Sequence, residues 1–163
     1  MRSVPVALLF LLLGPRGEAS GQDGCGLFGW SLRREIELFG DGYMPVVEST
    51  AWLPREGAFR LKLDPVAAAF YAVTPERGRD GGYGGSVTLQ WISAGRYQIA
   101  LSDDVWLDAI QGERRLPLLA TSHRADCPNI RMTMQVEVAS KPLTLQVGGA
   151  QGRLLDISIL RVR

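Results

Sequence analysis

The chain has 163 residues, which is enough for one domain and too few for two full ones. Apolar residues make up 46% and charged residues 21%, an ordinary globular composition, and a formal net charge of +1 argues against nucleic acid as a partner. One histidine and two cysteines are too few for most zinc sites, haem c attachment, iron–sulfur clusters or His-rich iron and copper centres. We therefore expect a protein that needs no cofactor.

The first 21 residues follow the order of a secretory signal peptide. A positive charge at Arg2 precedes an apolar run over 4–13, a Gly–Pro pair breaks this run, and small residues follow. The run is too short to span a bilayer, which takes about 20 apolar residues, and no later run is long enough. We expect cleavage after Ala19 or Gly21, a single domain over 22–163 and a periplasmic or secreted protein. The alternative is a buried N-terminal segment.

Export changes the interpretation of Cys25 and Cys127. An oxidising compartment and an even count favour a disulfide between them. The bond would close a loop of about 100 residues, which is worth roughly 4–5 kcal/mol in the chain-entropy model. The alternative is a nucleophilic thiol with His123 as its base, because His123 precedes Cys127 closely in the sequence. Pro128 indicates a turn at this point, and we expect the disulfide.

Apolar residues at helical spacing predict a short helix over 31–39, with Ser31 as its N-cap and Gly40 after its end. After this helix the apolar residues alternate, most clearly at 130–138, which is typical of a half-buried strand. Strands are predicted at 44–53, 58–63, 86–91, 96–101, 105–111, 116–120, 130–138, 143–147 and 154–162. A short apolar run at 69–73 and a glycine-rich loop at 74–85 interrupt the series. The pattern predicts an all-β, antiparallel sandwich or small barrel with one short N-terminal helix.

Asp103, Asp104 and Asp108 form the densest acidic group of the sequence. Three carboxylates suit Ca²⁺, but no EF-hand spacing is present and the first two stand where a turn is expected, so we favour the turn. On an alternating strand Asp108 shares a face with Trp106. If this face points inward, Asp108 needs a partner such as an arginine; if it points outward, Trp106 is an exposed ring on which a sugar can stack. His123, the only imidazole, is interpreted as a surface turn residue.

Arg77, Arg79 and Tyr83 lie on the glycine-rich loop 74–85, and loops of this kind often carry functional residues. Together with Trp106 they form our candidate ligand surface, provided that the fold brings them onto one concave surface. The glycines fit no phosphate-binding motif and are interpreted as turn residues. The four tryptophans and four tyrosines are accounted for by the core of a small sandwich.

Five segments of the sequence carry a likeness to known proteins, namely 85–89, 95–102, 106–111, 127–131 and 143–149. Together they resemble a group of small secreted proteins of Gram-negative bacteria of unknown function, some of which carry the name homogentisate 1,2-dioxygenase. The enzyme family of that name binds iron through two histidines and one glutamate on a much larger chain, and a single histidine cannot supply this ligand set. A second set, around Gly95–Tyr97, Asp103–Asp104 and Leu107–Asp108, resembles PA14-type carbohydrate-associated sandwiches and implies a jelly-roll-like sandwich.

These observations predict an exported, disulfide-stabilised β-sandwich of the cell envelope that acts by binding an unknown ligand or as an envelope accessory, without catalysis. The expected partner is an envelope polysaccharide or a protein. Two alternatives remain at this stage. One is a calcium-dependent carbohydrate-binding module that uses Asp103, Asp104 and Asp108. The other is a dioxygenase, which the residues do not support.

Overall fold

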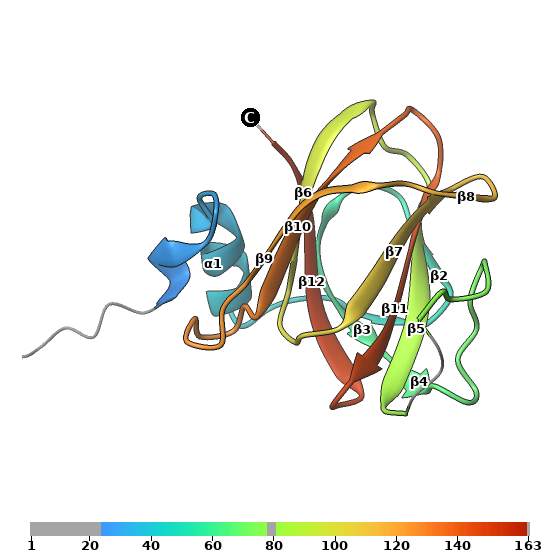
Figure 1. Ribbon diagram of the computed structural model, residues 1–163, viewed down its shortest axis with the longest axis horizontal. Helices are drawn as coiled ribbons and strands as arrows, with labels where there is room; N and C mark the ends of the chain where they lie inside the picture. The colour runs from blue at the N-terminus through green and yellow to red at the C-terminus, as the bar shows by residue number, and fades with distance from the viewer. Residues whose placement is uncertain (1–23, 78–80, 163) are drawn as a thin grey trace, which may run out of the picture.

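The computed structural model describes residues 24–77 and 81–162, so the predicted signal peptide and Arg79 lie outside the described residues. The elements in chain order are η1 (Gly24–Leu27), α1 (Arg33–Gly40), β1 (Val46–Glu48), β2 (Ala51–Leu53), β3 (Gly57–Lys62), β4 (Asp64–Pro65), β5 (Tyr83–Leu89), β6 (Gly95–Leu101), β7 (Trp106–Gln111), β8 (Arg114–Arg115), β9 (Leu118–His123), β10 (Met132–Val138), β11 (Leu143–Ala150) and β12 (Leu154–Arg161). The strands form two sheets packed face to face, with α1 beside one of them (Figure 1). The prediction of a β-sandwich with one N-terminal helix is confirmed.

The strands pair in a nested order. Sheet A has the order β1-β3-β12-β6-β10-β9, and sheet B has the order β2-β5-β11-β7-β8, with β4 paired to β5. Strand β3 therefore pairs with β12, β5 with β11, β6 with β10 and β7 with β8, all antiparallel. The chain passes from one sheet to the other between most of these strands. This order is that of a double-sheet jelly roll.

The sheets are mixed, which corrects the expectation of purely antiparallel pairing. Strand β1 runs parallel to β3, and β2 runs parallel to β5. The cause is one segment, 46–53, which follows the edge of sheet A, reverses at Thr50 with φ 70°, and follows the edge of sheet B. Alternation of apolar residues does not encode strand direction, so the parallel pairs could not be predicted from it. Short segments that cover sheet edges in this way protect them from pairing with other chains.

Helix α1 covers the outer face of sheet A, and a second apolar cluster fills the space between them. Its members are Cys25, Phe28, Leu32, Phe39, Ala100, Cys127 and Ile130. The helix begins two residues later than predicted, and Ser31 is not its N-cap. The capping position is Leu32, whose carbonyl accepts the Ile36 amide at 2.9 Å, while the carbonyl of Ser31 accepts Gln98 Nε2 of β6 at 3.2 Å. Within residues 24–77 and 81–162, no helix has the length and apolarity to span a membrane.

Cys25 and Cys127 form the predicted disulfide, with Cα atoms 4.6 Å apart and a sequence separation of 102 residues. No described cysteine is free, so the alternative of a nucleophilic thiol paired with His123 is wrong. Both cysteines are buried in the cluster beneath α1. The bond therefore fastens η1, at the start of the described chain, to the turn between β9 and β10.

Candidate functional site

Several concave surfaces of the described residues contain polar and aromatic side chains, and two of them are lined by the strands and their connections. The first, called the lateral cleft, has a volume of about 700 Å³ and lies between β7 of sheet B and β9 of sheet A. Its lining residues are Glu76, Arg77, Asp104, Val105, Trp106, Leu107, Asp108, Arg115, Leu116, Pro117, Leu118, Thr121, His123, Met132, Gly148 and Gly149. Trp106 and Arg77, two of the four residues predicted to form a ligand surface, both line this cleft.

Trp106 is held tightly in the lateral cleft. It lies on the outer face of sheet B, because its neighbour Leu107 belongs to the core between the sheets. A Cβ atom added to Gly148 would lie 2.3 Å from Trp106 Cζ2, so the indole packs directly on the glycine backbone. On another side the ring of Tyr71 lies 5.4 Å away, centroid to centroid. Trp106 is thus half-buried, and its ring is clamped between neighbouring groups.

The charges of the lateral cleft are largely neutralised within the protein. Arg115 Nε lies 3.2 Å from Asp108 Oδ2 and its Nη1 lies 3.3 Å from Glu76 Oε1, and Arg115 also donates to the carbonyl of Thr74. Asp108 thus lies on the outer face with Trp106 and still has an arginine partner. From the sequence, an arginine partner was expected only if this face pointed inward. These bonds attach the segment around residue 75 to the outer face of sheet B.

Gln146 fixes the same segment from beneath. Its side chain is fully buried on β11, accepts the Val73 amide at 3.3 Å and donates to the Val73 carbonyl at 3.0 Å. It also donates to Asp108 Oδ2 at 2.9 Å. Residues 66–77, called the covering segment, are therefore held across the outer face of sheet B. The polar groups of the lateral cleft serve first to hold this segment.

The three aspartates proposed as calcium ligands do not gather around one point. Asp103 accepts the amides of Asp104 and Gln151, both at 2.8 Å, and Asp108 is paired as described above. Asp104 Oδ1 lies 3.2 Å from Nδ1 of His123, which is exposed at the end of β9 and not in a turn. Within the described part of the chain, no three His, Cys, Asp or Glu side chains are grouped to hold a metal ion.

Tyr83 does not join Trp106 and Arg77. It is half-buried in β5, packs against the core between the sheets, and lies under the guanidinium of Arg153, 5.5 Å from its ring centroid. Arg77 is exposed, and Arg79 lies outside the described residues. Of the predicted ligand surface, the described residues bring Trp106 and Arg77 together and leave Tyr83 apart.

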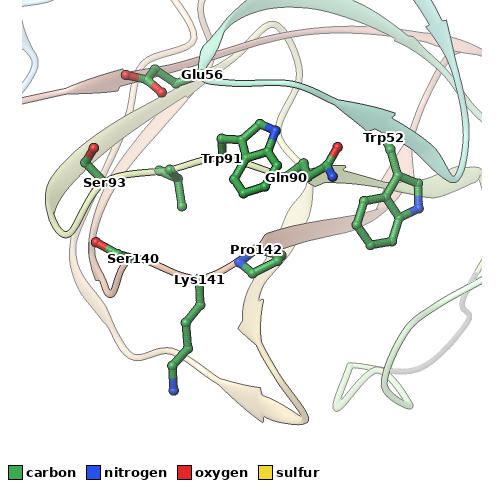
Figure 2. Close-up of a pocket in the computed structure, with 9 residues that line it drawn as sticks. Trp52, Glu56, Gln90, Trp91, Ser93, Ser140, Lys141 and Pro142 are labelled. Carbon is green, nitrogen blue, oxygen red and sulfur yellow. The ribbon is translucent and has the colours of Figure 1, made fainter.

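The second concave surface, called the end pocket, was not anticipated. It lies at the upper end of the sandwich in Figure 1, where β2, the β5–β6 connection and the β10–β11 connection meet, and has a volume of about 480 Å³. It is lined by Trp52, Glu56, Gln90, Trp91, Ile92, Ser93, Ser140, Lys141 and Pro142. Figure 2 shows the side chain of Gln90 between the two indole rings, and the ammonium of Lys141 pointing away from them.

The tryptophans of the end pocket correct the expectation that the aromatic residues build the core. Trp52 is 64% exposed and Trp91 is 68% exposed. Alternation over 86–91 places Trp91 on the same face as Val87 and Leu89, which are fully buried. Strand β5 ends at Leu89, however, so the alternation does not extend to Trp91. Two large exposed aromatic rings on one concavity make the end pocket a candidate interaction site.

The backbone of the end pocket is rigidly bonded. The amides of Gln90 and Trp91 donate to the carbonyls of Leu53 and Pro54, at 2.8 and 3.0 Å, which joins the β5–β6 connection to the end of β2. The Ala94 amide donates to Ser140 Oγ at 2.9 Å, which joins it to the β10–β11 connection.

The β10–β11 connection is itself held from below by Gln111 of β7. Gln111 Nε2 donates to the carbonyls of Ala139 and Lys141, and its Oε1 accepts the Ala139 amide, all at 2.9 Å. The exposed rings therefore stand on a backbone that is already ordered, which lowers the entropy lost when a ligand binds.

Compared with known proteins, the chain matches no family model, no curated protein and no solved structure. The end pocket offers two apolar faces, one amide, hydroxyl groups and one charge of each sign, from Glu56 and Lys141. Such a set can bind a ring-shaped ligand that has apolar faces and polar edges.

Proposed function

We propose that the protein is an exported, non-catalytic carbohydrate-binding protein of the cell envelope, and that the end pocket is its ligand site. One observation carries the proposal: Trp52 and Trp91 are 64% and 68% exposed and line the same pocket. Aromatic residues on a concave surface with a few polar groups are the usual composition of a small-molecule site.

The chemistry of the pocket favours a neutral sugar. A pyranose ring has C–H groups on its faces, which pack on an indole, and hydroxyl groups around its edge, which need hydrogen-bond partners. Gln90 supplies an amide donor and acceptor beside the rings, and Ser93 supplies a hydroxyl. Glu56 and Lys141 carry opposite charges, so the pocket has no net charge to select an ionic ligand.

Export is supported by two features. The first 21 residues have the pattern of a signal peptide, and the Cys25–Cys127 bond is of a kind that persists in oxidising compartments. The resemblance to small secreted Gram-negative proteins points the same way. An envelope polysaccharide is the partner that such a protein meets in the periplasm or outside the cell.

The test is to measure binding of soluble neutral oligosaccharides of glucose and of N-acetylglucosamine by calorimetry. Trp52→Ala and Trp91→Ala are each expected to weaken binding about tenfold or more, because a tryptophan at the centre of a site commonly contributes over 1 kcal/mol. Tyr43→Ala is the matched control, since Tyr43 is 89% exposed and does not line the end pocket.

Binding that is lost in both tryptophan variants and kept in the tyrosine variant supports the proposal. The proposal is overturned if none of the oligosaccharides binds to the wild-type protein, or if both tryptophan variants bind them as the wild-type protein does.

A further inference from the structure

The end pocket continues onto the outer face of sheet B. Trp52 of β2 stands opposite Thr88 of β5 in the parallel pair, and Thr88 stands opposite Thr144 of β11 in the antiparallel pair. Their flanking residues Leu89 and Leu143 point into the core, so the row formed by Trp52, Thr88 and Thr144 lies on the outer face. Both threonines are half-buried.

The two threonine hydroxyls form a paired polar group. Their Oγ1 atoms are 2.9 Å apart and share one hydrogen bond. A hydroxyl has one donor and two acceptor positions, so this bond leaves one O–H and several lone pairs of the pair available. A ligand hydroxyl can use these groups without breaking the existing hydrogen bond.

The row ends next to Thr144. Its next member is Ile110 of β7, which is 1% exposed, and the neighbouring Gln146 is fully buried beneath the covering segment. The open polar surface therefore extends from Trp91 through Gln90 and Trp52 to the threonine pair and no further along this row. It is longer than the end pocket itself.

We infer that the ligand is an extended oligosaccharide or polysaccharide chain, longer than the end pocket, and that Thr88 and Thr144 form a second subsite that binds its hydroxyl groups. This inference rests on the proposed function, because it assigns the remainder of the chain whose first rings pack on Trp52 and Trp91. The subsite adds affinity only when the chain is long enough to reach it.

The experiment is a series of oligosaccharides of increasing length, measured by calorimetry against the wild-type protein and the double variant Thr88→Val, Thr144→Val. Valine keeps the shape and favours strands, so the sheet is retained. Wild-type affinity is expected to rise with chain length. The double variant is expected to bind the long oligomers about threefold to tenfold more weakly and the short ones unchanged, because it lacks the hydroxyl groups of the subsite.

Two further variants serve as controls. Thr121→Val removes an exposed threonine from the lateral cleft and is expected to leave the length dependence intact. Thr144→Ser retains the hydroxyl and removes only the methyl group, so it is expected to keep the length dependence as well, which separates a role in binding from a role in packing.

The outcomes distinguish the inference from the proposed function. If short oligomers bind, depend on Trp52 and show no gain with length, or if the double variant keeps the gain, the subsite is refuted and the end pocket remains a sugar site. If no oligomer of any length binds, both fail.

Discussion

The lateral cleft and the end pocket both contain tryptophan and charged residues, but they use them differently. In the lateral cleft Trp106 is packed on Gly148, and Arg115 is shared between Asp108 and Glu76. In the end pocket the indoles are more than half exposed. The hydrogen bonds that order this site are made by backbone groups and by the side chains of Ser140 and Gln111, and none of them involves an indole ring.

The difference shows that concavity alone does not identify a ligand site. In the lateral cleft most charged side chains are paired with one another or with the covering segment. In the end pocket the indole rings and the Gln90 amide face solvent. We therefore expect substitutions in the lateral cleft to change the free energy of unfolding, and substitutions in the end pocket to change binding.

The largest expected effect on stability separates two tryptophans. Trp106→Ala removes a half-buried ring and leaves a gap above Gly148, so it should lower the free energy of unfolding by about 2–3 kcal/mol. Trp91→Ala removes an exposed ring and should change it by about 0.5 kcal/mol or less. Urea unfolding of the two variants measures both values, and equal losses would contradict the distinction between the surfaces.

A smaller effect is expected from a pair of glutamines. Gln146→Leu leaves the amide and carbonyl of Val73 without their partner and should cost about 1–2 kcal/mol, while loosening the covering segment. Gln90→Leu, on the exposed floor of the end pocket, should leave stability unchanged and weaken sugar binding. Thermal unfolding and hydrogen exchange at residues 71–77 provide the measurements; protection of these amides that is unaltered in Gln146→Leu would disprove the role of Gln146.

The smallest effect concerns calcium. Since Asp103, Asp104 and Asp108 each have a different partner, millimolar Ca²⁺ or EDTA should alter neither the melting temperature nor sugar binding. Asp104→Ala should bind sugar as the wild-type protein does. A rise in melting temperature with calcium that disappears in this variant would restore the calcium-dependent alternative.

Much of the fold could be predicted from the sequence, because strict alternation survives wherever a strand has one face in the core. The strand predicted at 130–138 contains β10 (Met132–Val138). The disulfide was predicted from the number of cysteines and from the expected compartment. The parallel edge pairs could not be predicted, since alternation is the same in either direction.

The site was harder to predict than the fold. Trp52 and Trp91 read as core residues, because exposure depends on where a strand ends and on what covers its outer face. The role of Gln146 could not be predicted either, because a single glutamine on an alternating strand does not indicate that a distant segment will bury it. Both features depend on contacts between segments that are far apart in the sequence.

The nested pairing of the strands has a consequence for folding. Strand β3 hydrogen-bonds to β12 as well as to β1, so the first long strand of sheet A lacks its antiparallel neighbour until residues 154–161 have been synthesised. Such a high contact order slows folding and postpones it to the end of synthesis.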